Sequence, residues 1–187
     1  PRRIREGPGN RMGDADLTPS FKAGYDTERL YLAAEIADDF VSAAPGAIAD
    51  GRNDQVHFQI AVETPARREA KDPRQAFGRA ESPEDRVIVA APAAGGTALA
   101  ELRRSGAAKQ PLGPARFGKT QAGYRISVAV SWNELGMPTP REGDSVVFNV
   151  VVFDADGVNA GHKTEWPWSG GPDYTYEDPA GWGELSF

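Results

Sequence analysis

Hydrophobic and polar residues alternate with a period of two along several stretches of this chain. In the segment DQVHFQIAVE, Val56, Phe58 and Ile60 fall on one side, and the residues between them are mostly polar. Successive side chains of a strand point to opposite faces, so this alternation predicts half-buried antiparallel strands. The strongest candidates are residues 29–39, 54–63, 123–132 and 144–156, and weaker ones are 21–25, 87–91, 97–102 and 183–187.

Three segments depart from simple alternation. Residues 144–156 are apolar on nearly every position except Asn149, which predicts a central strand. Residues 131–136, SWNELG, predict a short helical turn with a capping box at its start and a glycine at its end. Residues 64–85 are polar, charged and interrupted by proline, which predicts a long insertion between strands. We therefore expect one all-β domain over residues 1–187, an antiparallel β-sandwich of the jelly-roll or immunoglobulin-like kind.

Composition excludes several classes of function. The net charge of −6 argues against a nucleic-acid partner, because phosphate binding needs a cationic surface. The chain has no cysteine, which excludes disulfides and thiolate metal sites. It also lacks the run of about 18 apolar residues that a membrane-spanning helix requires.

Four pieces of the chain, taken in order, match a family pattern. They are FKAGYDTERLYLAAEIADD, NDQVHFQIAVE, GYRISVAVSWNELGMPTPREGDSVVFNVVVFDADG and DPAGWGELSF. Together they resemble family 9 carbohydrate-binding modules and the wider DOMON-like superfamily. The family's opening segment is not recognisable before Asp16, so we interpret residues 1–16 as a trimmed or divergent N-terminus.

The resemblance implies a non-catalytic sandwich that binds oligo- or polysaccharide and belongs to a larger polysaccharide-active or surface protein. An enzyme domain in the same parent chain, an extracellular or periplasmic location and bound calcium would follow from it. The residues agree with a non-enzyme, since no motif in the sequence fixes acid and base roles for a pair of carboxylates.

The family's sugar clamp consists of two aromatic side chains and polar hydroxyl-binding residues. Tyr176, just before EDP, matches one clamp aromatic, whereas Gly51 and Arg52 stand where the second is expected, and His57 replaces an acidic residue. The terminal loop adds Trp168, because a sugar stacks one apolar face on an aromatic ring. Our ligand-binding candidates are Tyr176, Trp168, His57, Gln59, Arg52 and Asn53, with a solvent-facing strand position as the alternative for His57 and core packing expected for Trp132 and Trp182.

Two acidic turns are candidates for a calcium site. Asp38 and Asp39 end one predicted strand, and Asp154 and Asp156 end another. Calcium takes about six to eight oxygen ligands, and an Asp-x-Asp-Gly turn supplies several of them. Ordinary turn formation is the alternative, since aspartate and glycine also favour turns. Asp54 is a third candidate, with a strand-end cap as its alternative.

Two other functions stay open from the sequence. A sandwich that has lost its ligand site would serve as a structural or interaction domain. Some DOMON-like domains bind haem for electron transfer, and the side chains that could ligate iron here are Met12, Met137, His57 and His162.

Overall fold

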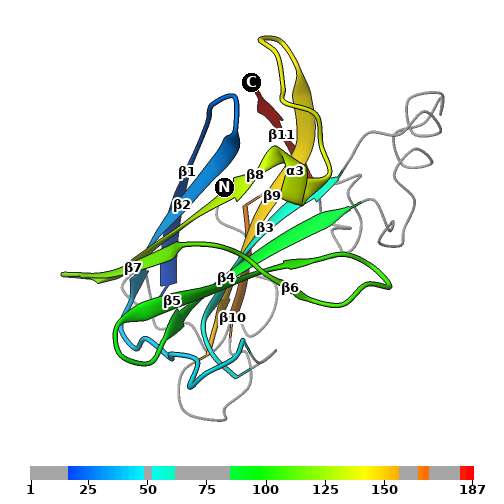
Figure 1. Cartoon of the computed structure of the whole chain (residues 1–187). Helices are drawn as coiled ribbons and strands as arrows, with labels where there is room; N and C mark the ends of the chain where they lie inside the picture. Colours follow the sequence, from blue (N-terminus) through cyan, green and yellow to red (C-terminus); the bar gives the residue numbers. More distant parts are fainter. Residues whose placement is uncertain (1–16, 49–51, 62–84, 156–163, 169–181) are drawn as a thin grey trace.

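Two antiparallel sheets pack face to face in the computed structural model of this chain (Figure 1). The structure describes residues 17–48, 52–61, 85–155, 164–168 and 182–187. Within these residues the only helix is a single short one, so the predicted all-β sandwich is confirmed. No helix in the described ranges is long and apolar enough to cross a membrane.

The smaller sheet has four strands in the order β1-β2-β8-β7. Its strands are β1 (Leu17–Tyr25), β2 (Arg29–Asp38), β7 (Ala115–Thr120) and β8 (Gly123–Ser131). In β2, the side chains that fall on one face are buried and those on the other are exposed or half-buried until the strand ends at Asp38. The sequence alternation of this segment is therefore reproduced in burial.

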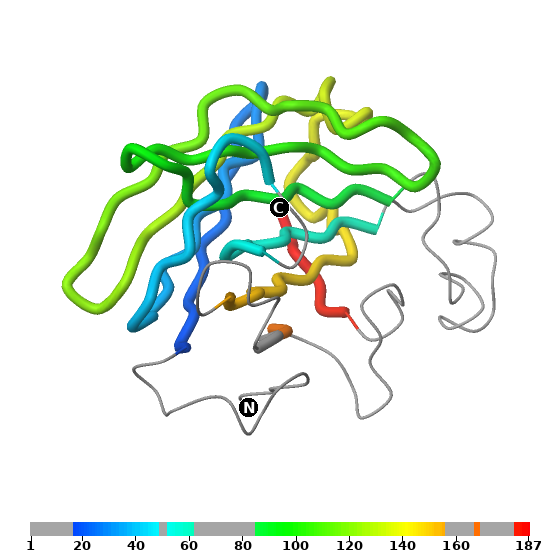
Figure 2. The backbone as a smooth tube through the Cα atoms, turned by 90° about the horizontal axis from the view of Figure 1, so that it is seen from below, coloured from blue at the N-terminus to red at the C-terminus, as the bar shows by residue number. Residues whose placement is uncertain are grey.

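The larger sheet has seven strands, and β9 (Ser145–Asp154) lies near one edge of it. Two short strands pair with β9 one after the other, β11 (Gly183–Ser186) along its first half and β10 (Thr164–Pro167) along its second. Figure 2 shows the red C-terminal segment beside the gold of β9. The other strands, in order from β9, are β3 (Gln55–Ala61), β4 (Arg86–Ala93), β5 (Thr97–Arg103) and β6 (Gln110–Pro111).

The main hydrophobic core lies between the two sheets. Leu30, Leu32 and Ile36 face Phe58 and other apolar side chains of the larger sheet, and all of them are buried. Other large side chains of this core include Ile60, Ile88, Leu102, Tyr124, Ile126, Trp132, Leu135 and Phe148. Full burial of each such side chain contributes on the order of 2 kcal/mol to the hydrophobic free energy of folding.

The outer face of the larger sheet is also buried. Every residue of β3 is buried, and so is β9 from Phe148 to Asp154. Ile48 packs on the outward side chains of β4, and Trp182 packs on Val151 and Phe153 of β9. The prediction of a half-buried strand at β3 is therefore wrong, because the second face of this sheet is covered as well.

The single helix, α3 (Trp132–Leu135), confirms the turn predicted at residues 131–136. Ser131 Oγ accepts a hydrogen bond from the Glu134 amide, Glu134 Oε2 accepts one from the Ser131 amide, and Gly136 has a φ of 66°. Trp132 is buried, as expected, and its indole nitrogen donates to the carbonyl oxygen of Asp26 at 2.9 Å.

The weaker strand candidates of the sequence correspond to β1, β4, β5 and β11, with β1 starting earlier than expected. Strands β6, β7 and β10 were not predicted; β7 contains Arg116, Gly118 and Lys119, a composition that gives no clear alternation. The predicted N-terminal segment 1–16 and, apart from Asp85, the predicted insertion at residues 64–85 lie outside the described residues.

Candidate functional site

Three buried aspartates converge at one end of the sandwich. Asp38 is the last residue of β2, Asp54 immediately precedes β3, and Asp154 is the last residue of β9. One carboxylate oxygen from each lies within 4.8 Å of the corresponding oxygens of the other two. The sequence predicted metal ligands at Asp38 and Asp154 on separate turns, and the fold brings these two together with Asp54.

The backbone around Asp54 holds its carboxylate in place. Asp54 Oδ2 accepts a hydrogen bond from the Ser42 amide at 2.8 Å, and Oδ1 accepts one from the Ala155 amide at 3.0 Å. The Asp54 amide in turn donates to the Ser42 carbonyl oxygen at 2.9 Å. Asp54 thereby links the segment after β2 to the residue that follows β9. It does more than cap the start of β3, which was the alternative interpretation from the sequence.

The close approach of β2 and β8 beside this centre depends on a glycine. A Cβ atom on Gly123, which has a φ of 148°, would lie 2.3 Å from the Ile36 carbonyl oxygen and 2.7 Å from the Asp38 amide nitrogen. Real Cβ atoms do not approach backbone atoms so closely. Only glycine therefore fits at the start of β8, and the next residue, Tyr124, enters the core beside the aspartates.

Burial and mutual repulsion make it unfavourable for all three carboxylates of the centre to be ionised together. Burial, followed by the negative charge of Asp38, raises the pKa of the Asp54 carboxyl to about 9. Burial also raises the pKa of Tyr124 well above its usual value, with the charges of the three aspartates as further causes. The Tyr124 hydroxyl is fully buried and makes no hydrogen bond with any described residue.

A divalent cation fits this donor set. Carboxylate oxygens are ligands that hard cations prefer, and a positive charge would offset both the burial and the repulsion that raise the pKa of Asp54. The buried Tyr124 hydroxyl, a group that ordinarily finds a partner, is a second observation in favour of a ligand here. Of the other predicted metal ligands, Asp39 is exposed and does not belong to this group, and Asp156 lies outside the described residues.

A row of polar side chains lies next to this centre on the outer face of the larger sheet. His57 Nε2 is 2.8 Å from Gln55 Oε1, and Asn149 Nδ2 donates to Gln59 Oε1 at 3.1 Å. The His57 ring also packs against Phe153, with ring centroids 4.6 Å apart. All of these side chains are buried, so a solvent-facing position for His57 is wrong, and contact of His57 and Gln59 with a sugar stays a prediction.

Arg52 and Asn53 directly precede Asp54 of the aspartate centre. Arg52 is exposed, whereas Asn53 is fully buried and its Nδ2 donates to the Asp54 carbonyl oxygen at 2.8 Å. Tyr176, the stacking residue indicated by the family pattern, lies outside the described residues. Arg52 is thus the one exposed side chain among the predicted polar ligand contacts that are described.

Trp168 and Trp182 pack against two different hydrophobic clusters. Trp168 packs against the main core, edge-on to Phe21 with ring centroids 5.0 Å apart. A Cβ atom on Gly183 would lie 2.6 Å from the Trp168 ring, so that ring lies directly over the β11 backbone. Trp182, for which core packing was expected, packs against the buried cluster of Val151 and Phe153 on the outer face of the larger sheet. Sugar stacking on Trp168 stays a prediction.

The haem candidates do not meet within the described residues. Met137 packs against the core between the sheets, whereas His57 belongs to the polar row on the outer face of the larger sheet. Met12 and His162 lie outside the described residues.

Comparison with known proteins finds several solved structures with a similar fold, among them two of family 9 carbohydrate-binding modules. A family 9 carbohydrate-binding module from Caldicellulosiruptor kristjanssonii, solved with glucose, matches with a TM-score of 0.58 and 16% identity over 99% of this chain and 83% of that one. The same organism's module solved with cellotriose matches with a TM-score of 0.57 and 16% identity, over 100% of this chain and 81% of the other. This chain has the fold of family 9 carbohydrate-binding modules. No family model and no curated protein matches the chain.

The structure adds two residues, Ser42 and Tyr124, that the sequence analysis did not assign to a site. The resemblance rested on strand-end motifs, and the structure shows that two of these motifs, ending at Asp38 and Asp154, meet at a common centre. Ser42 and Tyr124 complete its surroundings. A tyrosine on an otherwise aliphatic face of β8 was the only sequence signal for Tyr124, since a buried hydroxyl needs a partner. The DOMON-like part of the resemblance stays a prediction.

Proposed function

We propose that this chain is a non-catalytic carbohydrate-binding domain. The observation that carries the proposal is the likeness of nearly the whole chain to two family 9 modules solved with glucose and with cellotriose. The residues of the described structure are compatible with this function, because the polar row and Arg52 offer amide, imidazole and guanidinium groups that suit sugar hydroxyls. The domain would form part of a larger, extracellular or periplasmic polysaccharide-active or surface protein.

In this proposal the sugar binds at the end of the larger sheet where β3 begins. Arg52 is exposed there, and Asn53 and Asp54 follow it directly into the buried centre. Tyr176 supplies the ring on which a pyranose face packs, and His57 and Gln59 bind hydroxyl groups after local rearrangement. Because a sugar offers little apolar area, binding at such a site is weak and depends strongly on the stacking ring.

We further propose that Asp38, Asp54 and Asp154 hold a structural calcium ion. When bound, the ion supplies a positive charge that neutralises the buried carboxylates. The three residues come from the ends of β2 and β9 and the start of β3, so a shared ion would fasten the two sheets together beside the sugar site. Asp54 contributes a carboxylate already oriented by the Ser42 and Ala155 amides.

Isothermal titration with cello-, xylo- and manno-oligosaccharides tests the sugar site. We expect binding to at least one series, and we expect Tyr176→Ala to abolish it. Tyr25→Ala serves as the matched control, because Tyr25 is a half-exposed tyrosine at the end of β1 remote from Asp38. An absence of heat with every sugar would favour the ligand-free structural sandwich, and equal binding by both variants would refute the role of Tyr176.

A further inference from the structure

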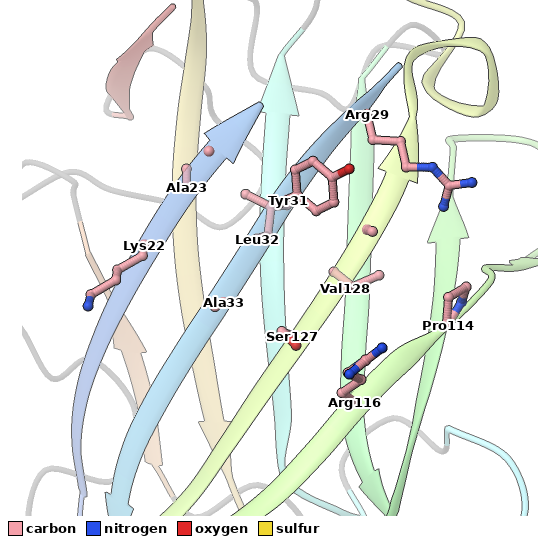
Figure 3. Close-up of a pocket in the computed structure, with 12 residues that line it drawn as sticks. Lys22, Ala23, Arg29, Tyr31, Leu32, Ala33, Pro114, Arg116, Ser127 and Val128 are labelled. Carbon is pink, nitrogen blue, oxygen red and sulfur yellow. The ribbon is translucent and has the colours of Figure 1, made fainter. Parts of the chain in front are cut away.

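A groove of about 560 Å³ lies on the outward face of the smaller sheet, away from the sugar site proposed above (Figure 3). The Tyr31 side chain lies near its middle, with Lys22, Arg29 and Arg116 around it (Figure 3). These side chains come from β1, β2 and β7. The groove belongs to the size range of small-ligand sites, which is about 300–1,000 Å³.

The strand register explains why the sheet surface is hollow here. Lys22 pairs with Ala33, Ala33 pairs with Ser127, and Ser127 pairs with Arg116. Two small side chains thus form the floor between two long cationic ones at opposite edges of the sheet. With neighbouring strands about 4.8 Å apart, the backbones that carry these two cations are roughly 14 Å apart. The floor is long enough for a short oligosaccharide.

The next row of the sheet presents an aromatic ring. Tyr31 pairs with Gly24 on one side and Ala129 on the other, so no large side chain beside it in the row covers its ring. Tyr31 is 43% exposed, and its hydroxyl donates to Asp26 Oδ2 at 2.8 Å, which fixes the ring orientation. An exposed and fixed aromatic ring is a surface on which the C–H face of a pyranose packs.

The charge of the groove is opposite to that of the whole chain. The chain carries a net charge of −6, but Lys22, Arg29 and Arg116 make no ion pair with a carboxylate of the described residues. The nearby acids are already engaged. Asp26 accepts hydrogen bonds from Tyr31 and from two backbone amides, and Glu35 pairs with Arg125 at 2.6 Å. The groove therefore offers cationic groups to an anionic ligand.

We propose that this groove binds an acidic oligosaccharide composed of uronic acids. One sugar ring stacks on Tyr31, and its neighbours lie along the floor formed by Ala33 and Ser127. Carboxylates of the chain pair with Arg116 and with Lys22 or Arg29, and the planar guanidinium of arginine suits the bidentate geometry of a carboxylate. The site is independent of the polar row, because it lies on the outer face of the other sheet.

Titration with oligogalacturonate tests this proposal, and its methyl ester is the matched ligand control because it keeps the sugar and removes the charge. We expect the acid to bind and the ester to bind at least about tenfold more weakly, because the ester cannot make charge-assisted hydrogen bonds with the cationic side chains. Equal affinity for acid and ester would overturn the proposal. So would equally tight binding of polyglutamate of the same charge, which would show that charge alone is recognised.

Matched variants locate the binding. We expect Arg116→Gln to weaken oligogalacturonate about tenfold, and Lys119→Gln to leave its affinity unchanged. Lys119 lies on the same strand and is exposed, but it pairs with Tyr124 and so points to the opposite face from Arg116. Equal weakening by both variants would overturn the proposal.

Tyr31→Phe should retain binding and Tyr31→Ala should lose it, with thermal melting confirming that each variant is folded. Retained binding in a folded Tyr31→Ala variant would overturn the stacking role and with it the site. The two proposals of this article fail separately. Loss of neutral-sugar binding in Tyr176→Ala concerns the site on the larger sheet, whereas the ester and Arg116→Gln concern only the groove.

Discussion

The two sheets of this sandwich have similar sequence patterns but different surroundings. In the smaller sheet, the outward positions of β2, such as Tyr31 and Glu35, are exposed to solvent. In the larger sheet, the equivalent outward positions of β3, His57 and Gln59, are buried. Alternation therefore tells which side chains share a face of a strand, but it does not tell whether that face is open.

The difference changes what a polar side chain does in each sheet. The buried amides of Gln59 and Asn149 are hydrogen-bonded to each other, and a buried polar group that loses a hydrogen bond is costly. The Glu35–Arg125 pair of the smaller sheet is about half exposed, so solvent can replace each partner. Polar substitutions in the larger sheet should therefore affect stability strongly. The outer face of the smaller sheet can change in sequence, or contact a ligand, at little cost in stability.

The largest expected effect comes from placing a charge on each outer face. Gln59→Lys should destabilise the protein by at least about 3 kcal/mol or prevent folding, because it buries an unpaired charge and removes the partner of Asn149. Ser127→Lys, on the outer face of the smaller sheet, should change the free energy of unfolding by less than about 0.5 kcal/mol. Urea denaturation of both variants measures the difference, and similar losses would contradict the comparison.

The junction of the two sheets at the aspartate centre gives the second prediction. Calcium should raise the melting temperature, with a stabilisation of about 2.7 kcal/mol when free calcium is about 100 times its Kd. Asp38→Asn should abolish this increase. Without calcium it should not destabilise, because it removes the charge that, after burial, contributes most to raising the pKa of Asp54. Asp39→Asn is the matched control, since Asp39 is exposed beside it.

Differential scanning fluorimetry with calcium or with EDTA measures this effect. A calcium response that is unchanged in Asp38→Asn would place the ion elsewhere. A response lost in Asp39→Asn but kept in Asp38→Asn would favour the exposed acidic turn that the sequence also suggested.

A third prediction compares one polar pair from each sheet. Asn149→Ala should cost about 1–3 kcal/mol, because it removes a hydrogen bond between two buried amides. Glu35→Gln should cost no more than about 1 kcal/mol, since its ion pair with Arg125 is largely exposed. Chemical denaturation in high and low salt distinguishes the two variants further. The free-energy cost of Glu35→Gln should fall in high salt, because salt screens the exposed ion pair, and the cost of Asn149→Ala should not change.

The smallest expected effect concerns α3, which links the sheets. Arg86 at the start of β4 donates a hydrogen bond to the Leu135 carbonyl oxygen of this helix. Arg104, which follows β5, donates one to the Glu134 carbonyl oxygen. The hydrogen bonds from Ser131 hold the pKa of Glu134 below its usual value. A lowered folded-state pKa means that the stabilisation is present above the unfolded-state pKa, near 4.3, and is lost as pH falls through the folded-state value.

Glu134→Gln should therefore reduce stability by less than about 1 kcal/mol at neutral pH and flatten the acid limb of the stability curve. Thermal melts from pH 7 to pH 3 measure this dependence. Glu142→Gln is the control, because this exposed glutamate lies outside the helix cap. An acid limb that is identical in the wild type and Glu134→Gln would contradict the capping role.

The sequence by itself determined the local structure of this protein. Alternation placed β2, β3, β8 and β9, and the capping residues Ser131, Glu134 and Gly136 placed α3, because these features depend on neighbours within a few residues. The order of the motifs was enough to indicate the family 9 fold. The short strand β7 has a mixed composition and could not be predicted from the sequence, because its pairing with β8, and not an alternating pattern, makes it a strand.

Only the tertiary structure decided which faces are covered and which distant residues meet. Asp38, Asp54 and Asp154 belong to three separate motifs, and they form one centre because β2 and β9 end, and β3 begins, at the same end of two packed sheets. His57 and Tyr31 have similar patterns around them, yet one is buried and the other lines an open groove. The physical reason is that burial depends on what packs above a sheet, and that contact is made by chain segments far away in sequence.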